Sequence, residues 1–194
     1  MIGVNDTEEI VSGMLSVKLL NFKGEEIDSL HHSKVDCAGD SVKEFLLKPL
    51  DKLKSEATYN FGSTFIMPNG SEADLVQDGF NDRFIYAEWK TDAEDNNTKL
   101  ISTSLFLCKI RDCDLEEVKI SVRQGAVANA LVLKTSVPVF YVFAESVLPG
   151  QFDDAGFTLL PGQEKVIFFK SANGTLIQDN FLDTVTVRHL RDSY

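Results

Sequence analysis

The stretch QFDDAGFTLLPGQEKVIFF (residues 151–169) decides the fold that this sequence predicts. Two apolar segments stand on either side of a Pro-Gly pair, which is typical of a turn because glycine reaches backbone angles that other residues avoid. The stretch holds carboxylates but no nucleophile, base or ligand cluster. It therefore predicts a structural role, with residues 166–169 as a buried strand and Phe152 and Phe157 anchoring the preceding loop.

The same pattern of short strands and turns recurs along the whole chain. Apolar residues alternate with a period of two, and turn residues follow roughly every ten positions, which indicates a β-sandwich. The region 55–82 is the least regular, and 51–57 is either one helical turn or a polar connector. The expected strands cover 14–22, 25–36, 41–50, 83–90, 99–110, 118–124, 130–136, 139–146, 165–169 and 183–190.

The strand pattern predicts an all-β protein made of two tandem antiparallel β-sandwiches. The charged segment 111–117 marks the boundary, so we expect domains at residues 1–113 and 114–194. Each of these is long enough to bury a core of its own. There is no alternation of strands with helices, and a parallel sheet is therefore not expected.

Composition bears on the partners that the protein is expected to have. The formal net charge of −11 repels phosphate backbones and anionic lipids, so neither nucleic acid nor a membrane is an expected partner. No apolar run approaches the roughly 20 residues of a membrane span. The first ten residues also lack the basic and apolar regions of a secretory signal.

The cysteines and the paired histidines are weak candidates for a metal or redox site. Cys37, Cys108 and Cys113 make neither a disulfide framework nor a zinc site; the last two are near enough in sequence to pair, although free thiols are favoured. His31 and His32 point to opposite faces of a strand and cannot share one metal in the usual way.

Two acidic groups are candidates for calcium binding through loop carboxylates. Neither has the spacing of a patterned oxygen cage, and solvated acidic turns are commoner. We therefore expect no metal, no cofactor and no catalytic residue in this chain. The acidic groups are Asp153 with Asp154, and Asp92 with Glu94 and Asp95.

Aromatic residues and glycosylation signals complete the candidate sites. Trp89 and Tyr86, together with Phe140 and Tyr141, could stack on sugar rings, although packing in a core is the favoured interpretation. Four Asn-x-Ser/Thr signals lie in polar contexts that could accept a glycan. The acceptor residues are Asn5, Asn69, Asn96 and Asn173.

Several segments carry a resemblance to a known family. VNDTEEIVSGMLSVKLLNFKGEEI (4–27) resembles the segment that follows the catalytic barrel in β-mannosidases of glycoside hydrolase family 2. STSLFLCKIRDCDL (102–115) is similar to the last strand of the first domain after that barrel. The final domain of the family is similar to three further segments. These are LVLKTSVPVFYVFAES (131–146), FDDAGFTLLPGQEKVIFF (152–169) and VRHLRDSY (187–194).

The resemblance implies that both antiparallel β-sandwiches are immunoglobulin-like. It also implies that they form a non-catalytic C-terminal accessory region of an enzyme that removes terminal β-D-mannose residues. The two catalytic glutamates of such enzymes lie on the barrel, and no segment here matches their motifs, so this chain alone is expected to be inactive. The barrel of the same parent chain is then the expected partner, with an oligomer contact as a second role. The implied setting is lysosomal or secreted for a eukaryotic source and periplasmic for a bacterial one.

Two other functions stay open at this point. A carbohydrate-binding module would need exposed aromatic side chains, and Trp89 is its best candidate. A cell-surface adhesion fragment would also use tandem sandwiches with glycosylation signals, but the Cys-Trp-Cys pattern of immunoglobulin domains is missing. A sandwich fold cannot separate these functions by itself.

Overall fold

The computed structural model describes residues 2–5, 8–44, 60–66, 72–78, 80–92, 100–172 and 181–193. Its contacts divide the chain into two compact units. The first comprises residues 1–21 and 26–114, and the second comprises residues 22–25 and 115–194. The described residues form strands, turns and short 3-10 helices, and every strand pairing is antiparallel. The predicted all-β, antiparallel fold class is therefore confirmed.

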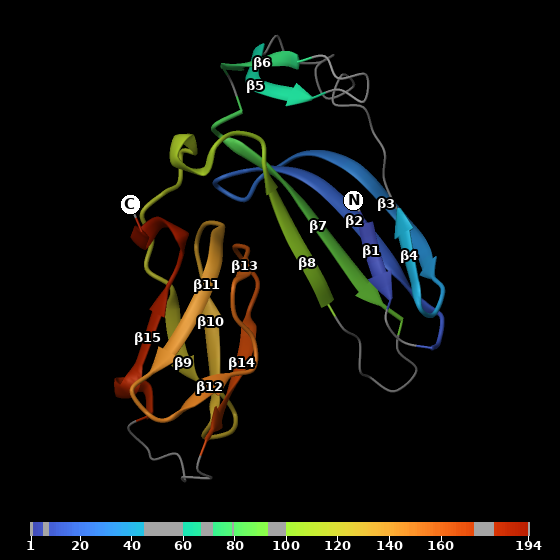
Figure 1. The fold of residues 1–194 in the computed structure, drawn as a ribbon. Helices are drawn as coiled ribbons and strands as arrows, with labels where there is room; N and C mark the ends of the chain where they lie inside the picture. Colours follow the sequence, from blue (N-terminus) through green and yellow to red (C-terminus); the bar gives the residue numbers. More distant parts are fainter. Residues whose placement is uncertain are drawn as a thin grey trace. The chain divides into compact units, whose positions relative to one another are not determined.

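A four-stranded sheet with the order β3-β2-β7-β8 dominates the first unit (Figure 1). Strand β2 is paired along both of its edges, with β3 on one side and β7 on the other. The strands of this sheet are β2 Val11–Asn21, β3 Glu26–Cys37, β7 Arg83–Thr91 and β8 Leu100–Phe106. Two small sheets are also formed by the described residues of this unit: β1 Ile2–Asn5 with β4 Ser41–Glu44, and β5 Asn60–Ile66 with β6 Glu72–Asp78.

The period of two in the sequence builds the core of the first unit. Leu15, Val17 and Leu19 share one face of β2, because alternate side chains of a strand point the same way. They pack in one buried cluster with Ala87 and Trp89 of β7. Strand β8 differs, because it lies at the end of the sheet order and exposes three apolar side chains. These are Leu100, Ile101 and Leu105.

The second unit is built from two sheets of short strands (Figure 1). One sheet has the order β12-β14-β10-β9 and the other has the order β13-β11-β15. The first contains β9 Ser121–Gln124, β10 Ala130–Lys134, β12 Gly150–Phe152 and β14 Lys165–Ser171. The second contains β11 Val139–Ser146, β13 Phe157–Leu159 and β15 Val185–Arg188. The part of the chain that the structure describes also contains three 3-10 helices: η1 Ile110–Asp112, η2 Phe181–Thr184 and η3 Leu190–Ser193.

Both sheets contribute to the core of the second unit. Buried residues of β10 and β14 meet those of β11 and β13, together with Phe181 of η2. The Phe152 ring lies 5.3 Å from that of Phe169 and 6.3 Å from that of Phe181. Phe157 packs against the same cluster. The predicted anchoring role of Phe152 and Phe157 is therefore confirmed.

The prediction that residues 166–169 form a buried strand is confirmed for the strand, but it is wrong for the burial of two of its four residues. Ile167 and Phe169 are buried, whereas Val166 and Phe168 are exposed on the opposite side of β14. The physical reason is the pleat, which sends successive side chains to opposite faces even where all four are apolar. The apolar run in the sequence thus concealed the alternation.

The irregular region predicted at 55–82 is a second correction, because it contains β5 and β6, which pair as an antiparallel hairpin. Glycine, serine and threonine interrupt the apolar residues of β5 and weaken the strand signal. The expected connector at 51–57 and the end of the strand expected at 41–50 lie outside the described residues. Among the described residues, no helix has the length and apolar character that a membrane crossing requires.

Candidate functional site

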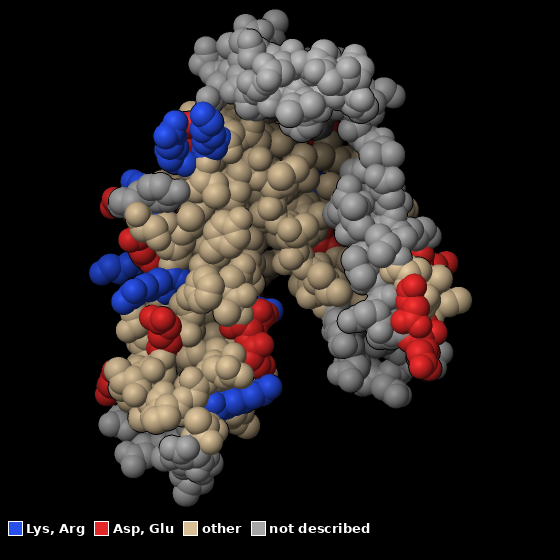
Figure 2. Space-filling view, viewed as in Figure 1, with Lys and Arg blue, Asp and Glu red and all other residues tan. Residues whose placement is uncertain are grey.

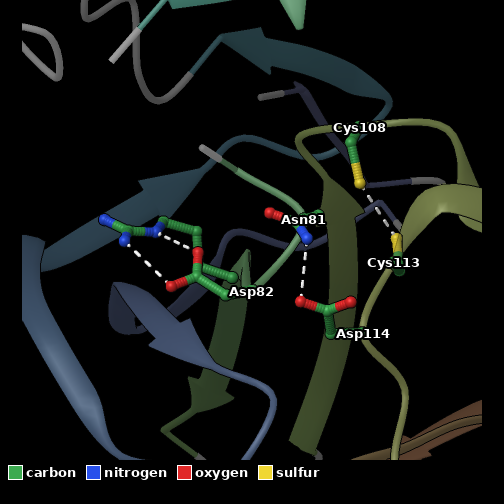
Figure 3. A network of polar contacts seen from close by, with 6 residues as sticks. Asn81, Asp82, Cys108, Cys113 and Asp114 are labelled. Carbon is green, nitrogen blue, oxygen red and sulfur yellow. Dashed lines mark hydrogen bonds and ion pairs between the residues drawn. The ribbon is translucent and has the colours of Figure 1, made fainter. Parts of the chain in front are cut away.

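A thiol pair forms where the chain leaves the sheet of the first unit. The Cys108 Sγ lies 3.1 Å from the Cys113 Sγ, and the two side chains point toward each other (Figure 3). Helix η1 lies between them and folds the chain back through two backbone bonds. In these, Asp112 N–H donates to the Lys109 carbonyl at 2.8 Å and Cys113 N–H donates to the Ile110 carbonyl at 3.2 Å. Both cysteines are half-buried thiols without a disulfide bond.

The surroundings of the pair hold both sulfurs in the thiol form. Burial raises the pKa of both cysteines, because a thiolate loses hydration there, and the charges of Asp112 and Asp114 raise both further. The hydrogen bond between the sulfurs raises the pKa of Cys113 and opposes the rise at Cys108. Since the thiolate is the nucleophilic form, the pair is poorly suited to nucleophilic catalysis at neutral pH.

The residue that follows the thiol pair is tied to the turn before β7. Asn81 Nδ2–H donates to Asp114 Oδ2 at 2.8 Å, and Asp114 N–H donates to the Asn81 carbonyl at 2.8 Å. This reciprocal contact joins positions that are 33 residues apart in sequence (Figure 3). It fixes the last residues of the first unit against the turn.

An arginine and its neighbour complete the network. Arg83 binds Asp82 with two hydrogen bonds, from Nε at 2.7 Å and from Nη2 at 3.0 Å, and its guanidinium lies 5.5 Å from the centre of the Phe80 ring. Asp82 is exposed, and surface ion pairs of this kind stabilise little. The network therefore positions a turn, and its carboxylates are not paired with a histidine or a nucleophile in the contacts described.

The acidic residues that were candidates for calcium binding contact a backbone N–H group or lysine side chains instead. Asp153 Oδ1 accepts the Phe168 N–H at 2.8 Å, and Asp154 forms an ion pair with Lys165 at 2.6 Å. Asp92 forms an ion pair with Lys34 at 2.8 Å. Glu94 and Asp95 lie outside the described residues. Within the described ranges, no group of three or more His, Cys, Asp and Glu side chains could hold a metal ion.

The paired histidines and the glycosylation signals fall in separate places. His31 and His32 are successive residues of β3 and pair with Val17 and Ser16 of β2. Asn5 ends β1, where it pairs with Ser41 of β4. The other acceptors, Asn69, Asn96 and Asn173, lie outside the described residues.

Two of the four aromatic candidates for sugar stacking, Trp89 and Tyr86, lie in the interior of the first unit. Trp89 is 9% exposed and Tyr86 is 2% exposed, both on β7. A sugar ring needs an open aromatic face, so it could reach neither residue unless the sheet rearranged. Both rings are buried, as the packing interpretation of the sequence expects, and so is Phe140 of β11, which is 2% exposed. That interpretation does not hold for Tyr141 of the same strand, which is 45% exposed.

One buried polar contact had no signal in the sequence. His189 is buried after β15, and its Nε2 lies 3.0 Å from the Val118 carbonyl, to which it must donate a hydrogen. Asp192 accepts the His189 backbone N–H at 2.8 Å. The contact joins residues 71 positions apart, and a lone histidine at the end of a strand does not indicate such a partner.

Sequence comparison finds a family for the second unit. Residues 115–193 match the Ig_mannosidase family, which is described as an Ig-fold domain. No curated protein matches the chain in sequence. The family match confirms the resemblance of residues 131–146, 152–169 and 187–194 to an immunoglobulin-like domain of the mannosidase type.

Solved structures extend the likeness to nearly the whole chain. A β-D-mannosidase from Dictyoglomus thermophilum matches 97% of this chain with 14% identity and a TM-score of 0.64. An exo-chitosanase from Amycolatopsis orientalis, in complex with a β-glucosamine derivative, matches 97% with 15% identity and a TM-score of 0.54. At such identities the likeness establishes a shared fold. This chain spans 20% of the first protein and 24% of the second.

Proposed function

Because residues 115–193 match the mannosidase type of Ig-fold domain, we propose that the chain is a non-catalytic accessory part of a glycoside hydrolase. Its role is to brace the catalytic domain of a β-mannosidase, the barrel being its partner within the same polypeptide. The family match is the observation that carries this proposal. The resemblance of residues 4–27 to the segment after such a barrel supports it further.

The size of the chain supports a non-catalytic role. A (β/α) barrel needs ~250 residues, which is more than the 194 of this sequence. The chain corresponds to about a fifth of the Dictyoglomus thermophilum enzyme. The hydrolysis of a glycosidic bond would then take place on residues outside this chain.

An outward-facing aromatic pair on the second unit supports a docking role. Tyr141 and Phe143 stand two positions apart on β11 and are half-exposed, whereas Val142 between them is buried. Exposed aromatic side chains next to each other favour an interaction surface. On the face seen in Figure 2, Lys and Arg side chains are interspersed with Asp and Glu among uncharged residues.

The first test uses the chain as it stands. We expect no release of p-nitrophenol from p-nitrophenyl β-D-mannoside and no heat of binding with mannobiose in calorimetry. Turnover of the mannoside would contradict the non-catalytic role. Saturable binding of mannobiose would contradict the bracing role and make the chain a carbohydrate-binding module.

The second test uses the longer native protein that the proposal requires. Phe143→Ser should lower the melting temperature of that protein but leave the melting temperature of this isolated chain nearly unchanged, because the side chain is half-exposed there. Val147→Ser, at an exposed apolar residue just after β11, is the matched control and should change neither. Equal effects of Phe143→Ser on the two proteins, or a native protein of only 194 residues, would contradict the proposal.

A further inference from the structure

The Cys108–Cys113 pair differs from the other cysteine of the chain in its geometry. The two sulfurs lie 3.1 Å apart, about 1 Å more than the S–S bond length of roughly 2.0 Å. Neither side chain is deeply buried, so an oxidant in solution can reach the pair. Cys37, in contrast, is fully buried at the end of β3 and contacts Ser41.

We propose that Cys108 and Cys113 close a disulfide bond that staples the turn between β8 and the end of the first unit. The ring so formed would contain η1, which already holds the two residues close through its backbone hydrogen bonds. Its exit is fixed as well, because Asp114 is bound to Asn81 by two hydrogen bonds. The native turn thus presents the two sulfurs to each other before any bond is made.

The oxidant for this step is a low-molecular-weight disulfide such as oxidised glutathione. One thiol of the pair loses its proton and attacks the glutathione disulfide, which forms a mixed disulfide and releases one glutathione thiolate. The second cysteine then attacks the protein sulfur of the mixed disulfide and releases the second glutathione. Two protein thiols are oxidised, one glutathione disulfide is reduced to two thiols, and the two protons go to the departing thiolates.

The chemistry of the two thiols favours a structural bond over a redox catalyst. Because burial and the neighbouring acidic charges raise the pKa of both sulfurs, each is a poor attacking thiolate and a poor leaving group. The bond should therefore form slowly, faster as the pH rises, and should also be reduced slowly. A redox catalyst needs the opposite, a thiolate that leaves readily.

The sequence around the pair makes the bond easy to detect. Trypsin cuts after Lys109 and Arg111, which separates the two cysteines into peptides 100–109 and 112–119, while Cys37 falls in peptide 35–43. After equilibration of the full chain with oxidised glutathione, acid quenching and alkylation of the unfolded protein, we expect the first two peptides to be linked. Peptide 35–43 should carry one alkyl group.

Three results of this mapping would overturn the proposal. They are alkylation of both Cys108 and Cys113, glutathione retained on either of them as the final product, and a link that involves Cys37. The variant Cys113→Ser should abolish the linked peptides, and Cys37→Ala should leave them. Wild-type mapping decides the question alone if Cys37→Ala fails to fold, since that side chain is wholly buried.

A stability measurement tests the structural role of the bond. Followed by the fluorescence of Trp89, the single tryptophan, the oxidised chain should melt about 5 °C above the reduced chain, because a small closed ring restricts the unfolded state. The double variant Cys108→Ser/Cys113→Ser should have the same melting temperature under oxidising and under reducing conditions. An unchanged wild-type melting temperature on oxidation would overturn the stapling role.

Discussion

The two units reach a β-fold in different ways. The sheet of the first unit relies on long ladders: β2 and β3 run for 11 and 12 residues, and β2 is paired along both edges. The second unit uses strands of 3 to 8 residues, and side chains bind the backbone around them. Asp153 accepts the Phe168 N–H, and Thr135 Oγ1 donates to the Val137 carbonyl at 2.6 Å.

This difference indicates where each unit is sensitive to substitution. A long ladder spreads its free energy over many backbone bonds, so only a residue that separates the strands should matter greatly. Short strands depend on a shared core and on the side chains that hold their turns. The family match covers residues 115–193, which form the unit of short strands. In this unit, particular side chains hold the turns and strands in place.

The largest effect is expected in the core of the second unit. Phe169 is 2% exposed and contacts Phe152 and Phe181, so Phe169→Ala should lower the free energy of unfolding by about 3–5 kcal/mol. Phe168→Ala is the matched control on the same strand; its side chain is 39% exposed, and about 0.5 kcal/mol is expected. Urea unfolding followed by far-UV circular dichroism measures both. Equal losses would refute the inward–outward alternation of β14.

A glycine gives the corresponding test in the first unit. A Cβ at Gly13 of β2 would collide with the Lys90 carbonyl, the Trp89 indole and the Thr91 Cα. Gly13→Ala should therefore separate β2 from β7 and cost about 1–3 kcal/mol. The Trp89 emission should shift to the red at a lower urea concentration, whereas Ser12→Ala should leave it in place. An unchanged urea midpoint of the Trp89 emission in Gly13→Ala would show that the β2–β7 pairing accommodates the added methyl group without a loss of stability.

The loop between β12 and β13 should show a smaller effect. Asp153→Ala leaves the Phe168 N–H without its carboxylate acceptor, so a loss of about 1–2 kcal/mol is expected. Asp153→Asn keeps an oxygen acceptor and should restore most of the stability. Asp154→Ala removes only an exposed ion pair with Lys165 and should cost less than about 1 kcal/mol. If Asp154→Ala were the more harmful change in urea unfolding, the charge would matter more than the backbone bond.

The smallest effect concerns an exposed charge cluster. Hydrogen bonds from Lys134 and then Arg123 lower the pKa of Glu164 from its ordinary value of 4.5. A lowered pKa gives stability that is fully present above 4.5 and is lost as the pH falls through the value in the folded state. Glu164→Gln should therefore flatten the acid side of a plot of melting temperature against pH, and added salt should reduce the difference. If Glu164→Gln left the acid side of this plot unchanged, the charge cluster would not contribute to the stability of the folded protein.

Much of the fold could be predicted because local residues determine it. Strand β11 lies at residues 139–146 as expected, since apolar alternation and a preceding proline mark it. Strands β5 and β6 were missed because glycine and polar residues interrupt their pattern. The exposure of Phe168 was missed because an apolar run looks the same whether or not its alternate side chains reach a core.

The candidate site could be predicted only in part. The spacing of Cys108 and Cys113 allowed a pair, but their approach depends on the 3-10 turn at residues 110–112. The bonds between Asn81 and Asp114 and between His189 and Val118 join distant segments. Nothing local marks either contact, because the tertiary fold creates both. The burial of Trp89 was open to prediction, since aromatic residues that alternate in an apolar strand usually pack inward.

The position of β8 at the end of its sheet carries a risk of fibril formation. Residues 100–107, LISTSLFL, have no charge and no proline, and Leu100, Ile101 and Leu105 are exposed there. An uncharged outer strand of this kind can add a strand from another copy of the chain, as in cross-β assembly. In concentrated solution, polymerisation should begin at this strand. A lysine in place of the exposed Thr103 would put a repelling charge in the middle of the segment and keep the copies apart.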